Sequence, residues 1–277
     1  MKKFENYLIA SDIDGTLLWE ASYVNPRNLE RLRDFCEGGG HFALSTGRNH
    51  KDIYKVVGEF GEFITMPCIL CNGSYLYDTK TGTIMNPQYF ERKKTTEFLR
   101  ELRRDFPHIG YRASFEGGFL VPEDDTVIMP ILRAMQIDML ATFCPAEKFE
   151  EHDLFKSVIV GNPEDLQKLQ DVIAARYSDV FTVTTSGPSM IELQPHGVSK
   201  SFQIPYLKSL YPGAELWCIG DYENDIEMLR DADVAVCPAN AMDAVKAIAD
   251  VQVCHCKDGA LADLVDEIER RINEKNG

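Results

Sequence analysis

Short apolar runs that stop abruptly at polar residues recur at both ends of the chain. Residues 7–10, 42–44 and 216–219 are such runs, and each leads into a Ser or Gly and then a hydroxyl or carboxyl side chain. Continuous apolar runs of this length are typical of strands buried on both faces in a parallel sheet. Residues 26–36, between the first two runs, carry apolar side chains at helical spacing. The alternation predicts an α/β fold, with a parallel sheet and helices on both faces.

This alternation breaks near residue 88 and returns near residue 199. The intervening pattern predicts two helices at 95–106 and 163–177, and strands at 111–115, 118–121, 157–160, 181–184 and 190–193. A mixed α+β stretch of about a hundred residues is long enough to form its own small domain. We therefore expect a discontinuous core of residues 1–86 and 191–277 with an inserted α+β domain of residues 87–190.

The charge of the chain narrows its possible partners. Of its 277 residues, 29 are Lys or Arg and 44 are Asp or Glu, so the net charge is −15. Such an acidic chain lacks the positive surface that nucleic acids or anionic membranes attract. No apolar run is longer than four residues, and the first six residues do not resemble a secretion signal. We expect a cytoplasmic protein without nucleic-acid or membrane partners.

The eight cysteines allow two interpretations. Cys68 with Cys71, and Cys254 with Cys256, could be combined with His255 into one zinc site. Neither cluster has the second matching pair that marks a structural zinc site. Buried, reduced thiols are the simpler interpretation, and they suit a cytoplasmic protein.

Polar side chains follow the predicted strands at the edge where parallel sheets place their ligands. Asp12 and Asp14 come after the first strand, and two carboxylates at this spacing point the same way and can share a divalent cation. Thr46 and Gly47 follow the second strand, where a hydroxyl and a free amide form an anion site. Taken singly, each pair is more often an ordinary structural feature, an acidic turn in the first case and a helix cap in the second.

The third such strand leads into Asp221, Asn224 and Asp225 at the start of a predicted helix. Acidic residues near a helix start also occur simply as caps. Lys200 begins the helix just before this strand, and a helix lysine is most commonly exposed to solvent. If it instead belongs to the same site as these acids, its ammonium should lie within ion-pair reach of the Asp12 carboxylate.

Six sequence pieces in this order resemble the haloacid dehalogenase-like superfamily of aspartate-nucleophile phosphatases. They are DIDGTL from residue 12, STGR from 45, CNGS from 71, GVSKS from 197, GDYENDIEML from 220 and PANA from 238. More narrowly, the chain is similar to the Cof-type subfamily. That resemblance implies a Rossmann-like core and makes the insert a class IIB cap.

The resemblance also implies a role for each residue. Asp12 would be the nucleophile that forms an aspartyl-phosphate, and Asp14 would protonate the leaving alcohol and later activate water. Mg²⁺ would lie between Asp12, Asp14 (through its backbone carbonyl) and Asp221. The phosphoryl group would be held by four groups: Thr46, the Gly47 amide, Lys200 and Asn224. Asp225 would be an outer partner of the metal rather than a direct ligand.

The expected function is therefore Mg²⁺-dependent hydrolysis of a small phosphorylated metabolite, by a monomer or small homo-oligomer. A phosphoryl-transfer mutase, a non-catalytic binding module and a dinucleotide-binding enzyme are the alternatives. The mixed α+β insert disfavours the mutase, and the presence of both Asp12 and Asp14 disfavours the binding module. The dinucleotide-binding enzyme is disfavoured because no GxGxxG motif follows the first strand. Sugar phosphates and phosphorylated cofactors are the candidate substrates. Arg112, Glu116, Phe119 and His152 are candidate specificity residues in the insert.

Overall fold

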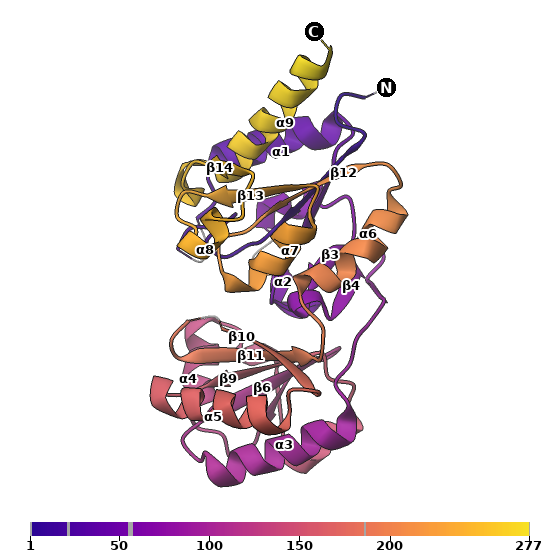
Figure 1. Ribbon diagram of the computed structural model, residues 1–277. Coiled ribbons are helices and arrows are strands. Elements are labelled where there is room, and N and C mark those ends of the chain that lie inside the picture. Colours follow the sequence, from indigo (N-terminus) through magenta and orange to yellow (C-terminus); the bar gives the residue numbers. More distant parts are fainter. Residues whose placement is uncertain (1, 21–22, 55–57, 186, 277) are drawn as a thin grey trace.

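The computed structural model describes residues 2–20, 23–54, 58–185 and 187–276. Figure 1 shows two bodies, one above the other, with both chain ends at the far end of the upper body. The lower body is the insert, which we call the cap, and the upper body is the core. Two chain segments connect them, one after β5 (Thr83–Met85) and one after β11 (Met190–Pro195).

The core is built on a five-stranded, fully parallel sheet in the order β14-β13-β12-β1-β2. Its strands are β1 (Tyr7–Ser11), β2 (His41–Leu44), β12 (Glu215–Ile219), β13 (Val234–Pro238) and β14 (Val251–Val253). The central strands are buried along nearly their whole length, as their continuous apolar sequences predict. The α/β core expected from the sequence is thus observed.

Helices cover both faces of this sheet (Figure 1). They are α1 (Pro26–Glu37), α2 (His50–Ile53), α6 (Ile204–Leu210), α7 (Ile226–Asp231), α8 (Asp243–Lys246) and α9 (Ala260–Asn276). Helices α1 and α9 pack against each other on one face, and α6 and α7 lie on the other. The local sequence sets where α1 begins: the Asn25 side chain accepts a hydrogen bond from the Arg27 amide, and Pro26 occupies the first helical position.

A small antiparallel sheet of β3 (Cys68–Leu70), β4 (Tyr75–Asp78) and β5 lies beside β2. The apolar run that begins at Cys68 also forms a buried strand, β3, but this strand is not a member of the main parallel sheet. Instead, β3 pairs with the hairpin that follows it, and its one bridge toward the main sheet, among the residues described, is the parallel bridge between Ser45 and Ile69. The nearby hairpin offers β3 a full antiparallel ladder, which explains the difference.

The cap contains a six-stranded sheet in the order β10-β11-β9-β6-β7-β8. Its strands are β6 (Gly110–Phe115), β7 (Gly118–Pro122), β8 (Ala141–Cys144), β9 (Lys156–Val160), β10 (Phe181–Thr185) and β11. Helices α3 (Arg92–Asp105) and α5 (Pro163–Arg176) cover the face turned away from the core (Figure 1). The short helix α4 (Ile128–Ala134) packs on the opposite face.

The cap sheet extends further along the chain than expected. The predicted boundary at residue 190 falls at the start of β11, which pairs with both β9 and β10. The second sheet therefore includes residues 190–195, and the return to the core follows Pro195. The helix α4 and the strand β8 lie in a stretch for which the sequence patterns predict no element.

The eight cysteines are all free thiols, distributed over both bodies. Burial raises the pKa of the Cys68 thiol to about 12 and that of Cys71 to about 11. Among the described residues, no helix combines the length and apolar composition that crossing a bilayer would need.

Candidate active site

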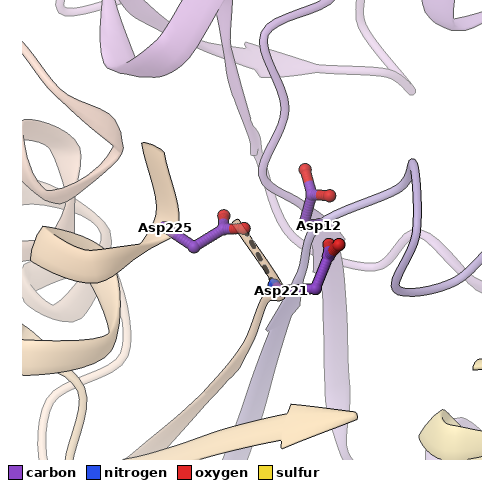
Figure 2. Close-up of side chains that lie close together, drawn as sticks. All are labelled: Asp12, Asp221 and Asp225. Atoms are coloured by element: carbon purple, nitrogen blue, oxygen red, sulfur yellow. Dashed lines mark hydrogen bonds between the residues drawn. The ribbon is translucent and has the colours of Figure 1, made fainter. Parts of the chain in front are cut away.

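Three carboxylates at two neighbouring strand ends form the centre of the site (Figure 2). Asp12 follows β1 and Asp221 follows β12, its parallel neighbour, so both leave the same edge of the sheet. Asp225 lies in the 3-10 turn that leads into α7. One ligand atom of each carboxylate lies within 4.8 Å of those of the other two. The parallel topology thus concentrates three acids from distant parts of the sequence.

Lys200 lies between two of these acids. Its Nζ atom donates hydrogen bonds to Asp12 Oδ1 and to Asp225 Oδ1, each at 2.7 Å. The Lys200 side chain is fully buried, so this ammonium is not the solvent-exposed lysine that its helix position alone would suggest. The proximity of Lys200 to Asp12 that was expected from the sequence is observed.

Asp225 organises the loop around it. Its second oxygen, Oδ2, accepts hydrogen bonds from the backbone amides of Asp221 and Tyr222 at 3.0 and 3.1 Å. Figure 2 draws the first of these bonds. A Cβ atom at Gly220 would lie 2.4 Å from Asp225 Cγ, so glycine is required for this close approach. Both oxygens of Asp225 are therefore engaged, one with Lys200 and one with the loop that carries Asp221.

The cluster carries more negative charge than the protein itself neutralises. Three carboxylates face one ammonium, which leaves a net charge of −2 when all are ionised. Burial is the main cause that raises the pKa of Asp12, with Lys200 opposing it and the other acids adding to it. Burial and Asp225 raise the pKa of Asp221 to about 6, although the Thr16 hydroxyl donates to Asp221 Oδ1 at 2.7 Å.

Such a donor set fits a divalent cation. Carboxylate oxygens are the ligands that hard cations such as Mg²⁺ and Ca²⁺ prefer. A charge of +2 would offset the net charge of the cluster and restore the ionised state of the buried acids.

The loop after β2 lies next to the acids. Thr46 is almost fully buried, and its backbone amide donates to Ile69 O at 2.9 Å while its carbonyl accepts the Asn72 amide at 3.1 Å. Asn72 in turn accepts a hydrogen bond from Asn224 Nδ2 at 3.4 Å. These bonds tie the loop of Thr46 and Gly47 to the turn that carries Asn224. Thr46, Gly47 and Asn224 all line the same cavity as Asp12.

Asp14 is held by an arginine. Arg48 donates from Nε to Asp14 Oδ2 at 3.0 Å and from Nη2 to Asp14 Oδ1 at 2.8 Å, a bidentate pair. Its third nitrogen, Nη1, donates to the buried Asp52 carboxylate at 3.2 Å. Because Asp52 anchors the guanidinium, Arg48 fixes the direction in which the half-exposed Asp14 carboxylate points.

The cap contributes a buried ion pair to the same place. Lys156, on β9, donates to Glu192 Oε1 on β11 at 2.7 Å and to the Gly47 carbonyl at 2.8 Å. Glu192 Oε2 accepts from Asn72 Nδ2 of the core at 2.6 Å. A Cβ at Gly47 would lie 2.7 Å from Lys156 Nζ, so this glycine lets the cap lysine reach the loop. The cap is thereby joined to the loop that carries Thr46.

These groups surround a cavity of about 460 Å³ between the core and the cap. Of the eight site residues predicted from the sequence, those that line it are Asp12, Asp14, Thr46, Gly47, Asp221 and Asn224. The other two, Lys200 and Asp225, lie fully buried beneath Asp12. The fold therefore brings all eight to one place.

Four charged lining residues were not assigned from the sequence: Arg48, Asp52, Lys156 and Glu192. Arg48 stands inside the STGR piece, directly after Gly47, so its position was a usable signal. Lys156 is the first residue of β9 and Glu192 lies between Ile191 and Leu193 of β11, so each is a charged residue beside apolar ones in a largely buried strand, which is also a recognisable signal. Among the four candidate specificity residues, Arg112 lines the cavity and stacks on the buried Phe119. Glu116 and His152 are not among the residues that line it.

The model of one protein family, described as haloacid dehalogenase-like hydrolase, matches residues 9–265. A putative phosphatase of Haemophilus influenzae is 26% identical over 83% of this chain and 88% of its own length. A pyridoxal phosphate phosphatase of Escherichia coli is 25% identical over 89% of this chain and 92% of its own.

A solved structure of a sugar phosphatase of haloacid dehalogenase subclass IIB has the same fold. It superposes with a TM-score of 0.80 at 18% sequence identity and covers 94% of this chain and 98% of its own. The predicted architecture, a Rossmann-like parallel sheet with an inserted α+β cap of class IIB, is confirmed by this likeness and by the observed topology.

Proposed function

We propose that this chain, which belongs to the haloacid dehalogenase-like hydrolase family, is a phosphatase that hydrolyses small phosphomonoesters through a covalent phosphate on Asp12. The observation that carries the proposal is the convergence of Asp12, Lys200 and Asp221 at one edge of the parallel sheet. The names of the relatives support it, because both similar proteins reported above are called phosphatases.

In the first half-reaction an oxygen of Asp12 attacks phosphorus, and the bond between phosphorus and the ester oxygen breaks. Asp14 gives its proton to the departing alcohol. In the second half-reaction water attacks the aspartyl-phosphate, Asp14 takes a proton from that water, and inorganic phosphate leaves with the Asp12 carboxylate restored. The distinct surroundings of the two acids support this division of roles. Asp12 is buried against Lys200, whereas Asp14 is half exposed and directed by Arg48.

Four groups of the chain would hold the phosphoryl oxygens during both steps. They are the Thr46 hydroxyl, the Gly47 amide, the Lys200 ammonium and the Asn224 amide group. Donors that are fixed in place before the reaction stabilise developing charge without a cost of reorganisation. The buried contacts of Lys200 and the hydrogen bonds around Thr46 and Asn224 supply that rigidity.

We assign the divalent cation as Mg²⁺, held by the carboxylates of Asp12 and Asp221 and the backbone carbonyl of Asp14. When bound, it offsets the repulsion between the Asp12 carboxylate and the phosphate anion. Asp225 acts from outside this set, because its two oxygens already bind Lys200 and the loop amides. The net charge of −2 within the acid cluster supports this assignment.

The substrate is a small phosphorylated metabolite. The cavity of about 460 Å³ has room for a phosphate ester of modest size and is closed on one side by the cap. The substrates that relatives are named for, such as pyridoxal phosphate in the Escherichia coli protein, are of this size class. We also propose a cytoplasmic location, which the eight free thiols support.

The test is hydrolysis of p-nitrophenyl phosphate with and without Mg²⁺, followed by the release of nitrophenolate. We expect no turnover in EDTA and a loss of at least about 10³-fold in kcat for Asp12→Asn. The matched control is Asp171→Asn, which makes the same change at an exposed position on α5 and should keep full activity. Turnover of Asp12→Asn at the rate of the control would contradict the proposal.

A further inference from the structure

The face of the cap sheet that looks toward the core is chemically distinct from its other face. Arg112 on β6, Val158 on β9 and Glu192 on β11 are cross-strand neighbours in one row. Side chains in one row of a sheet point to the same face. All three line the cavity above Asp12, together with Lys156 and Met190 from the same strands. This face therefore forms the roof of the active site.

Arg112 is the unusual member of this roof. Its side chain is only 8% exposed, yet among the described residues no carboxylate lies within ion-pair distance of it. Among the residues that the structure describes, its one side-chain hydrogen bond is a long contact of 3.5 Å from Nη1 to Ser114 Oγ. The guanidinium stacks on the Phe119 ring, with Cζ 3.8 Å from the ring centroid. Stacking fixes the plane of the guanidinium, while most of its five N–H donors have no acceptor in the described part of the chain.

The nearby acids are already engaged elsewhere. Glu192 accepts from Lys156 and from Asn72, and Asp52 accepts from Arg48. Burial lowers the pKa of Arg112 despite the attraction of these two acids. A buried charge without a partner is costly to keep, so a partner that arrives with the ligand explains why it is tolerated.

The charges on the cap side of the cavity indicate which charge that ligand group should carry. Arg112 and Lys156 are positive and Glu192 is negative, so the cap side of the cavity has a net charge of +1. Lys156 and Glu192 neutralise each other. One negative charge on the ligand, placed at Arg112, would balance the cap side.

The rest of the roof is apolar. Helix α4 and the segment after it supply Ile128, Ile131, Leu132 and Met135, and the sheet supplies Val158 and Met190. Apolar side chains and thioethers pack well against rings and alkyl chains. They offer no partner to the several hydroxyl groups of a sugar, each of which would lose its hydrogen bonds to water.

We propose that this roof is a leaving-group subsite in which Arg112 binds an anionic oxygen of the substrate and the α4 wall covers an apolar or aromatic body. The substrate class is then a phosphomonoester with a second acidic group, rather than a neutral sugar phosphate. The subsite rests on the proposed phosphatase function for its position, because it lies on the same cavity as Asp12.

The first experiment compares matched aryl phosphates in the presence of Mg²⁺. The acidic probes are 3- and 4-carboxyphenyl phosphate, and the neutral probes are the corresponding carbamoylphenyl phosphates, which have the same shape. We expect wild-type kcat/KM to favour the better acidic probe over its amide by about 10- to 100-fold, the worth of a charge-assisted hydrogen bond pair. A phenylene bisphosphate tested alongside identifies whether a carboxylate or a phosphate is the better second anion.

The variant Arg112→Gln should reduce this preference to within about threefold of unity. Arg133→Gln, at an exposed arginine of α4 outside the cavity lining, is the matched control and should keep the wild-type preference. An unchanged preference in Arg112→Gln, or no preference in the wild type, would overturn the subsite.

Thermal unfolding separates binding from a structural role. Arg112→Gln removes a buried charge that has no acidic partner, so the Tm of the free protein should stay the same or rise. A clear fall in Tm, with the loss of activity equal on acidic and neutral probes, would assign Arg112 to packing on Phe119 and overturn the proposal.

The apolar wall is tested by Ile131→Asn, because Ile131 is a partly buried lining residue. We expect kcat/KM to fall more for the carboxyphenyl phosphates than for glycerol 1-phosphate, which lacks a ring. An equal fall on both would remove the α4 wall from the subsite.

Calorimetry distinguishes failure of the subsite from failure of the proposed function. In the Asp12→Asn background, the carboxyphenyl phosphate should bind more tightly than its amide, and adding Arg112→Gln should abolish the difference. If this difference is found but the wild type does not turn the probes over, the subsite stands and the phosphatase assignment fails. If the wild type turns the probes over but binding shows no such difference, the phosphatase assignment stands and the subsite fails.

Discussion

Replacing Lys200 with Met would remove the ammonium and keep a side chain of similar length. The ammonium is fully buried and bonds to Asp12 and Asp225 at 2.7 Å each. Burial by itself would lower the pKa of Lys200, but these two acids raise it above the usual value. In the variant, both carboxylates stay buried without their cation.

Removing one partner of a buried ion pair costs about 3–5 kcal/mol, because the remaining charge is left uncompensated. The chain can limit that cost by protonating an acid, at about 1.4 kcal/mol for each unit between the pH and the pKa. We therefore expect Lys200→Met to lower the free energy of unfolding by about 3 kcal/mol at pH 7.5 in EDTA. In a domain of this size, such a loss lowers the Tm by roughly 6–12 °C.

The penalty should shrink as the pH falls. Burial already raises the pKa of Asp12, and without the opposing Lys200 that folded-state pKa lies further above the unfolded-state value, so the folded variant binds a proton more tightly. Its stability relative to the wild type therefore rises on acidification toward about pH 4, the unfolded-state value for Asp. Adding Asp225→Asn should recover at least about 1 kcal/mol in a double-mutant cycle.

Urea unfolding in EDTA at pH 7.5 and 5.0 measures these differences. Lys208→Met is the matched control, since Lys208 lies on α6, directly after the 3-10 turn that carries Lys200, and forms a half-exposed pair with Asp233. That control should lose no more than about 1 kcal/mol and show little dependence on pH. A Lys200→Met protein as stable as the control, or a penalty that does not change with pH, would refute the reasoning.

Three further outcomes are expected. Mg²⁺ should raise the Tm at pH 7.5 and raise it progressively less below about pH 6. Burial raises the pKa of Asp221 to about 6, so protons compete with the cation below that pH. A fluorescence melt in which the Mg²⁺-induced increase in Tm does not depend on pH would contradict this. Gly73→Ala should lower the free energy of unfolding in urea by at least about 3 kcal/mol, because the added Cβ would lie 1.8 Å from Ser199 O. Gly213→Ala, at a similar positive φ but in open space, should lower it by about 1–2 kcal/mol. Equal losses in the two variants would be inconsistent with the clash. Arg48→Lys should lower kcat about tenfold in steady-state assays by loosening the general acid, and a change confined to KM would argue against a positioning role.

The core could be predicted from the sequence because its signals are local. The strands around residues 7–10, 42–44 and 216–219 are continuous apolar runs, and parallel strands end at one edge by topology alone. The side chains that follow them therefore had to meet. The resemblance to a known family added their roles, which remain predictions until the variants are measured.

The cap side of the site could not be predicted in the same way. Arg112, Lys156 and Glu192 lie on separate strands, and nothing local shows that one face of their sheet turns toward the core. Helix α4 was missed because it is only seven residues long, contains Pro130 and carries apolar residues without a helical stripe. It is stable through its packing on the cap sheet, which only tertiary structure reveals.

The boundary of the cap was also set by tertiary structure. The sequence pattern placed it at residue 190, where a strand begins after a turn. That strand, β11, pairs on both sides within the cap sheet, so its residues through Pro195 belong with the cap. Strand pairing depends on neighbours that are distant in sequence, and the periodicity of one segment does not identify them.

The most direct test of the central claim is to trap the phosphoryl group on the enzyme. The wild type is mixed with p-nitrophenyl phosphate and Mg²⁺, quenched in acid within milliseconds, digested and analysed by mass spectrometry. The account predicts one added phosphoryl group on the peptide that contains Asp12, present during turnover, absent in Asp12→Asn and absent after the substrate is exhausted. Steady turnover with that peptide unmodified at every time point, or with the phosphoryl group on another residue, would contradict it.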